Sequence, residues 1–134
     1  MSAYTKIKTK LNDQESLVYS IKAMGYDPAI YEVACKLAGF SGHKNPHANI
    51  VIPRAQLQAK SAAYCDIGFQ KQANGFELLV NDVDEHKMPG FLEDLNLNYN
   101  VGLAMKKAQL AGIKVTARKD SVIKGKKHVQ LVFA

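Results

Sequence analysis

Residues 63–80 read AYCDIGFQKQANGFELLV, a stretch with the sequence pattern of a β-hairpin. Its two ends are rich in apolar and aromatic residues, a composition that is typical of β-strands. Between these ends, Asn74 and Gly75 give a strong signal for a tight hairpin turn, because both residues tolerate the backbone conformation that such turns require. We therefore predict two antiparallel strands, over 63–69 and 76–80, joined by that turn.

Outward from this hairpin, the chain alternates between two periodicities. Apolar residues that recur at every second position predict strands, and apolar residues that recur every three or four positions predict helices. Capping residues and glycines mark the helix ends, and Pro89 opens the second helix at a position where proline is tolerated. The remaining predicted elements are strands over 4–10, 31–37, 50–52, 113–118 and 129–133, and helices over 13–24 and 89–111.

The predicted element order is β-α-β-β-β-β-α-β-β. Strand runs broken by two helices indicate an α+β fold, with a mostly antiparallel sheet and two helices on one face. The other face of the sheet is then open to solvent or to a partner. Residues 54–62 fit either a loop or a single helical turn, and residues 81–87 are predicted to form an acidic loop. The length of 134 residues is that of one domain, which we expect to span 1–134.

The inward members of the periodic segments form the predicted core. We expect these residues to be mostly buried: Ile7, Leu17, Ile21, Val33, Ile67, Leu78, Leu92, Leu95, Val115 and Leu131. The two cysteines, Cys35 and Cys65, also lie among apolar residues. We predict that both are reduced, buried thiols without a bound metal.

Positive charge is concentrated near one end of the sequence. Residues 106–134 contain eight basic residues and one acidic residue, a net charge of +7, whereas the remaining residues are close to neutral. Such an asymmetry favours an anionic partner, although lysines also protect the edges of sheets from aggregation. If the first and last strands were neighbours in the sheet, one positive surface could include Lys6, Lys8, Lys10, Lys114, Arg118, Lys124, Lys126 and Lys127.

Motifs for catalysis or metal binding are weak. The sequence has no G-x-S-x-G segment, and neither cysteine lies in a nucleophile motif. Two groups have ligand types that suit a metal; they are Cys35, His43, His47 and Cys65, whose spacing does not match a zinc site, and Asp82, Asp84, Glu85 and His86. A polar loop and a solvated acidic loop before a helix explain these groups as well. We therefore predict no catalytic residue, no metal site and no cofactor.

Three stretches resemble a known family. They are YTKIKTKLNDQESLVYSIKAMGYD over 4–27, YCDIGFQKQANGFELLVND over 64–82 and FLEDLNLNYNVGLAMKKAQLAGIKV over 91–115. Together they resemble the hypothetical chloroplast reading-frame 35 family, whose function is unknown. The resemblance carries no catalytic residues over to this chain. It implies a setting in a cyanobacterium, a plastid or a cyanophage.

The sequence favours a non-enzymatic binding or adaptor protein. We expect it to dock on an anionic macromolecule through the open sheet face and the basic C-terminal hairpin. A protein is favoured over a nucleic acid as this partner. The first alternative is a protein that binds RNA or single-stranded nucleic acid, and the second is an enzyme or metal protein without a recognisable motif. The first ten residues, MSAYTKIKTK, lack the apolar core of a secretory signal, and no apolar run has the length of a membrane span. We expect a cytoplasmic protein, in a cyanobacterial host or a plastid stroma, without a membrane partner.

Overall fold

The computed structural model describes residues 3–39, 44–61 and 63–134. The strands are β1 (Tyr4–Lys8), β2 (Ala29–Lys36), β3 (His47–Ile52), β4 (Ile67–Gln72), β5 (Gly75–Asn81), β6 (Val115–Ile123) and β7 (Lys126–Phe133). The helices are α1 (Gln14–Ala23), α2 (Arg54–Lys60), α3 (Asp82–Lys87) and α4 (Phe91–Leu110).

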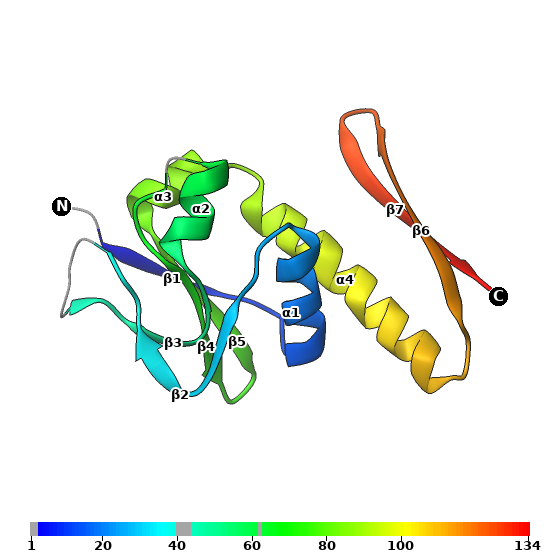
Figure 1. Cartoon of the computed structure of the whole chain (residues 1–134), viewed down its shortest axis with the longest axis horizontal. Coiled ribbons are helices and arrows are strands. Elements are labelled where there is room, and N and C mark those ends of the chain that lie inside the picture. Colours follow the sequence, from blue (N-terminus) through cyan, green and yellow to red (C-terminus); the bar gives the residue numbers. More distant parts are fainter. Residues whose placement is uncertain (1–2, 40–43, 62) are drawn as a thin grey trace.

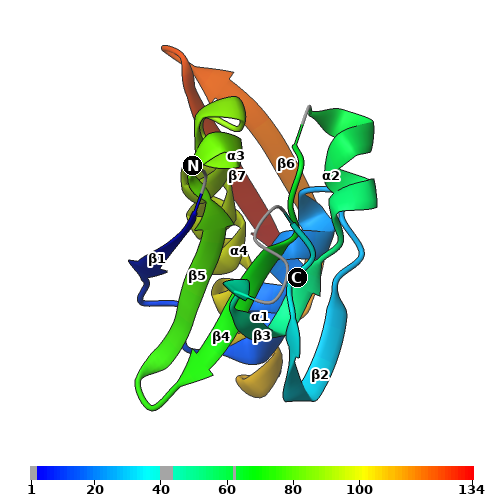
Figure 2. The same ribbon diagram turned by 90° about the vertical axis from the view of Figure 1, so that its left-hand side faces the viewer.

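The predicted fold class and the order of the main elements are confirmed. Five strands form a sheet in the order β1-β5-β4-β3-β2, and every pair of neighbours is antiparallel. The two long helices, α1 and α4, pack against each other on one face of this sheet (Figures 1 and 2). Strands β6 and β7 form a separate two-stranded sheet that follows the end of α4.

The hairpin from which the fold was inferred is strands β4 and β5. Its last pair is Gln72 with Gly75, so the turn lies one residue earlier than the sequence indicated. Gly75 has a φ of 135°, which a residue with a side chain rarely adopts. The turn signal therefore identified the hairpin correctly, but the turn consists of residues 73 and 74. Gly75 is the first residue of strand β5.

The main core lies between the sheet and the helices. Ile7, Leu78, Phe69 and Ile50 are paired across four adjacent strands, so their side chains form one row beneath the helices. Five predicted core residues are fully buried; they are Leu17, Ile21, Ile67, Leu78 and Leu95. Four more are half-buried; they are Ile7, Leu92, Val115 and Leu131.

The opposite face of the sheet is closed at its centre. A small apolar cluster forms there around Leu37 and Leu79, with Tyr4 packed against it. The closure depends on Gly68, because a Cβ at that position would lie 2.8 Å from a methyl carbon of Leu37. The Tyr4 hydroxyl donates a hydrogen bond of 2.7 Å to the carbonyl of Asp66. The face that was expected to be open is thus partly covered by the chain itself.

Two residues on β2 contradict the prediction that they are buried. Val33 is 85% exposed, and Cys35 is an exposed free thiol, whereas Cys65 is buried as predicted. The cause is the edge position of β2 together with a shift of its register against β3 between Ile30 and Cys35. Period-two alternation assigns faces only while the register is regular, so it fails across this shift.

The prediction of an acidic loop over 81–87 is also wrong, because this segment contains helix α3. Asn81 caps α3, and its side-chain oxygen accepts the N–H of Val83. Asp84 is fully buried, and its carboxylate accepts the backbone N–H groups of Tyr64 and Cys65 at 2.9 and 2.8 Å. Two donors offset the cost of burying the charge, which makes this acid a structural residue. The ambiguous segment 54–62 contains helix α2.

The start of α1 is tied to α4 by polar contacts. Asp13 is the N-cap, and its carboxylate accepts a hydrogen bond of 3.0 Å from the N–H of Ser16. The same carboxylate accepts one of 2.6 Å from Lys106 on α4. These contacts, with the Lys106 bond contributing most, hold the pKa of Asp13 below its usual value. Further along, the buried hydroxyl of Ser20 donates to the carbonyl of Leu95 at 2.6 Å.

A test of this contact uses Asp13→Asn, which keeps the helix cap but removes the charge that pairs with Lys106. Because folding lowers the pKa of Asp13, its stabilisation is present above the unfolded pKa of about 4 and is lost as pH falls through the lower folded value. We expect the melting temperature of the variant to fall less than that of the wild type between roughly pH 5 and pH 2. An equal fall in both proteins would contradict the role assigned to Asp13. Glu32→Gln, on exposed β2, is the matched control.

Candidate functional site

The most distinctive surface of the molecule is the hairpin β6–β7, which lies apart from the five-stranded sheet and runs back alongside α4 (Figure 1). Its turn is Lys124-Gly125, and both residues have positive φ angles, of 52° and 78°. Two successive residues of this kind form the turn that matches the natural twist of a hairpin. Ile123 and Lys126 are the closing pair, and the pairing continues to Val115 and Phe133 with one shift near the base.

This hairpin is only lightly packed. No residue from Val115 to Phe133 is fully buried. Three large apolar side chains stay about half or more exposed, namely Val122 at 67%, Ile123 at 53% and Phe133 at 49%. An isolated two-stranded ribbon is marginally stable in water. The ribbon therefore depends on its few contacts with the body, and it leaves apolar surface available to a partner.

Arg118 is the main contact between the hairpin and the helices. Its guanidinium donates hydrogen bonds of 2.7 Å to the hydroxyl of Tyr19 on α1 and to the side-chain oxygen of Asn98 on α4. The same group binds both carboxylate oxygens of Asp120, at 2.8 and 2.9 Å. The hydrogen bonds with Asp120 are the main reason that the pKa of Arg118 is raised and that of Asp120 lowered. The pair thus remains ionised around neutral pH, and Arg118 serves as an anchor.

Lys127 provides a second, more exposed contact. Its ammonium lies 2.9 Å from both carboxylate oxygens of Asp94 on α4. Since the Lys127 side chain is 61% exposed, water screens this pair and it stabilises the hairpin only weakly. Arg118 and Asn98 therefore do most to fix the position of the ribbon.

A groove of about 620 Å³ separates the hairpin from the body. Strand β6 contributes Arg118, Asp120, Ser121 and Val122 to its lining, whereas β7 contributes Lys127. The opposite wall comes from the end of α1, from α2 and from the start of α4. Its residues include Met24, Tyr26, Lys60, Met88, Phe91 and Leu97. The lining thus combines apolar side chains, mostly on the body wall, with charged side chains on both walls, a combination that is typical of ligand-binding clefts.

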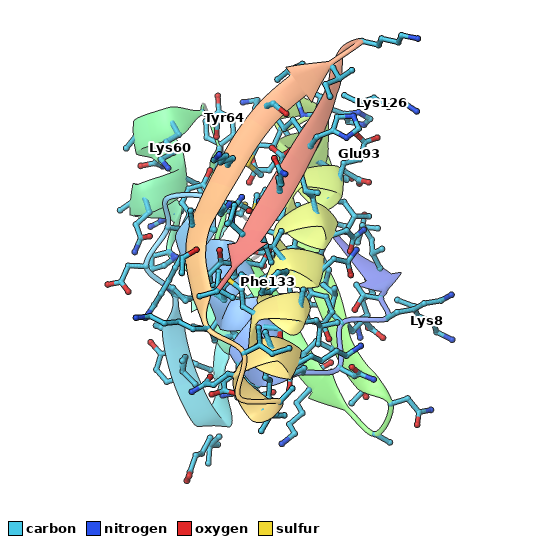
Figure 3. All side chains as sticks on the ribbon, turned by 90° about the vertical axis from the view of Figure 1, so that its right-hand side faces the viewer. Lys8, Lys60, Tyr64, Glu93, Lys126 and Phe133 are labelled. Carbon is cyan, nitrogen blue, oxygen red and sulfur yellow. The ribbon has the colours of Figure 1, made fainter. Side chains whose placement is uncertain are left out.

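The structure separates the predicted basic residues into two groups. Lys6 and Lys8 belong to β1, which pairs with β5, and Lys10 follows that strand. The other five belong to the hairpin or directly precede it, so the first and last strands are not neighbours and do not form the continuous surface considered above. Figure 3 illustrates this, with Lys8 beside β1 and Lys126 at the hairpin tip.

Within the hairpin group, the basic residues differ in their surroundings. Arg118 and Lys127 are bound to acids on the same molecule, so they mainly hold the hairpin in place. Lys114, Lys124 and Lys126 are exposed to solvent at the two ends of the ribbon. These three are the basic side chains best placed to contact a partner.

No feature of the sequence predicted the groove. Lys60, whose ammonium lies 4.5 Å from the centre of the Tyr26 ring, comes from the segment that was ambiguous between loop and helix. Val122 lines the groove although period-two reasoning assigned no role to it. No local signal identifies such residues, because the groove exists only once the hairpin is placed over the body.

The metal candidates are not supported by the described geometry. In residues 3–39, 44–61 and 63–134, no three acidic, histidine or cysteine side chains converge as a metal site requires. Asp84 instead binds two backbone N–H groups, and Cys35 is exposed while Cys65 is buried. His43 lies outside the described residues. None of the helices in the described part of the chain is both long and apolar enough to cross a membrane.

A prediction follows from the role of Arg118 as an anchor. Arg118→Ala removes the hydrogen bonds to Tyr19 and Asn98, and loss of a charged hydrogen-bonding group costs roughly 1–3 kcal/mol. We expect faster backbone motion in β6 and β7, measured by ¹⁵N relaxation, with little change in β1 to β5. Lys119→Ala, at the exposed neighbouring position, is the control and should leave the hairpin unchanged. Identical relaxation in the two variants would show that Arg118 does not anchor the ribbon.

Comparison with known proteins gives a family but no function. A family model described as "Protein of unknown function (DUF1257)" matches residues 20–129, which include the last turn of α1, all of α4 and most of the hairpin. No curated protein matches the sequence significantly. No solved structure matches it significantly either.

Proposed function

Since the chain belongs to the family of proteins of unknown function DUF1257, we propose its function from the geometry: it is a non-enzymatic binding or adaptor protein that docks on an anionic macromolecule through hairpin β6–β7. One observation carries the proposal. The ribbon has five basic residues and one acidic residue, yet none of its residues is fully buried. Folding alone does not require a charged ribbon that contributes so little to the core.

The mixed character of the ribbon favours a protein partner. Val122, Ile123 and Phe133 expose apolar surface beside the lysines, and a protein surface can cover both. A single-stranded nucleic acid is instead held by several aromatic side chains on which successive bases stack, and Phe133 is the one Phe, Tyr or Trp of the ribbon. Tyr4, the aromatic residue on the lysine-bearing face of β1, already packs against the apolar cluster of that face. RNA binding is therefore the alternative and not the first proposal.

The sheet face is a weaker candidate than the hairpin. Leu37 and Leu79 are almost fully buried there, so the centre of this face offers little surface to a partner.

An enzymatic function has even less support than binding through the sheet face. The described residues that line the groove include no histidine or cysteine that could act as a base or a thiol nucleophile.

The resemblance to the chloroplast reading-frame 35 family extends the proposal to a setting. The stretches that carry it include β1, α1, β4, β5 and α4, and thus most of the described fold. We infer that the protein works in the cytoplasm of a cyanobacterium, including one infected by a phage, or in a plastid stroma. The anionic partner would then be found in that compartment.

The proposal is tested by reversing the charge of the exposed hairpin lysines. The triple variant Lys114→Glu, Lys124→Glu, Lys126→Glu leaves both anchors intact, and surface changes of this kind shift stability by less than about 0.5 kcal/mol each. We expect immobilised variant protein to retain its partners from a cyanobacterial lysate at least about tenfold less than the wild type, because like charges in an interface cost several kcal/mol.

The matched control is Lys6→Glu, Lys8→Glu, Lys10→Glu, which makes the same charge change on and beside β1. It should retain partners as the wild type does. If both triple variants lose them equally, net charge and not the hairpin governs binding, and the proposal fails. Treating the lysate with ribonuclease separates the two partner classes, since loss of all hairpin-dependent retention would favour RNA.

A further inference from the structure

The backbone of β6 has one edge that pairs with β7 and one edge that borders the groove. In the described part of the chain, the second sheet consists of these two strands alone. Figures 2 and 3 look at the molecule from opposite sides, and in both β6 lies on the side of α2 while β7 lies toward α4. The edge of β6 that faces α2 therefore presents backbone N–H and C=O groups without a strand partner.

The hairpin register indicates which groups these are. Ile123 and Lys126 flank a two-residue turn, and such a closing pair is hydrogen-bonded. In antiparallel strands, hydrogen-bonded pairs alternate with pairs that are not. The backbone groups of Arg118, Asp120 and Val122 thus point toward the free edge. The side chains of the same three residues line the groove, so edge and groove form one continuous site.

The chemistry of the groove restricts its occupant. The lining contains four basic side chains and two acidic ones; they are Lys60, Lys87, Arg118 and Lys127, and Asp94 and Asp120. The remaining lining is largely apolar, and Val122 is 67% exposed at the hairpin wall. An occupant that fits is extended, acidic and apolar at alternate positions, since successive side chains of a strand point to opposite faces.

We propose that β6 accepts, as a third strand in this groove, an extended segment of a partner protein with alternating acidic and apolar residues. The inference rests on the proposed function and names the partner chemistry and the mode of contact. A second copy of the chain fits less well, because β6 carries two basic residues, Arg118 and Lys119, against one acidic residue, Asp120, so two β6 strands would bring together like net charge.

The test is a titration of the ¹⁵N-labelled full chain with a capped eight-residue peptide of alternating Glu and Val. We expect saturable shifts of the amide resonances from Arg118 to Ile123 at peptide concentrations up to about 1 mM. The same peptide with the amides of one edge N-methylated should bind at least about tenfold more weakly, because it cannot complete the ladder. A peptide of alternating Lys and Val should not shift these resonances.

Variants of the protein, in place of variants of the peptide, test which residues form the site. Val122→Pro removes an edge N–H that the hairpin itself does not use, whereas Val122→Ala keeps it. We expect Val122→Pro to lose peptide binding and Val122→Ala to retain most of it. On the body wall, Lys60→Glu should weaken binding at least about tenfold. Lys22→Glu, on the exposed side of α1 and outside the groove, should not.

Three results would overturn the inference: equal binding of the N-methylated peptide, shifts confined to the tip around Lys124 and Lys126, or tighter binding of an oligouridylate RNA to the β6 amides. The second would leave the proposed function intact, because it still shows attraction of an anion to the hairpin. Failure of the proposed function would appear elsewhere, as unchanged partner retention by the hairpin triple variant. Binding of the N-methylated peptide to wild-type protein keeps the test decisive even if Val122→Pro does not fold.

Discussion

The contact of Arg118 with the two long helices is the interaction on which the position of the hairpin depends. One guanidinium joins Tyr19 on α1, Asn98 on α4 and Asp120 on its own strand. A planar group with five donors can bind several acceptors at once, which an ammonium cannot do in a fixed geometry. Because the ribbon buries none of its residues fully, this contact does most to hold the ribbon over α4 beside the groove.

The two sheets of the molecule differ in how far their faces and edges are covered. The five-stranded sheet is covered by helices on one face and is partly closed by Leu37 and Tyr4 on the other. Buried carboxylates such as that of Asp84 fix the surrounding loops through backbone N–H groups. The two-stranded sheet instead keeps lysines, apolar side chains and one backbone edge exposed. A rigid body that presents a separate, lightly packed ribbon is an arrangement suited to binding.

Much of the fold could be predicted from the sequence, whereas the groove could not. The hairpin of 63–80 and both long helices follow from local periodicity and turn chemistry, which act over a few neighbouring residues. Helix α3 was missed because Asp84 is stabilised by N–H groups from Tyr64 and Cys65, which are distant in sequence. Val33 was assigned to the core because a register shift cannot be read from alternation. Counting charge also cannot reveal that the guanidinium of Arg118 binds Tyr19 and Asn98 on the same molecule.

Amide hydrogen exchange across β6 in the free full-length chain tests this account most directly. A formed ribbon with one free edge should show two alternating classes of amide in this strand. Lys119, Ser121 and Ile123 should be protected by their bonds to β7, whereas Arg118, Asp120 and Val122 should exchange rapidly. Rapid exchange at all six positions would mean that the ribbon is not stably formed. Protection of all six would mean that the edge is already covered in the free protein, and either result would contradict the account.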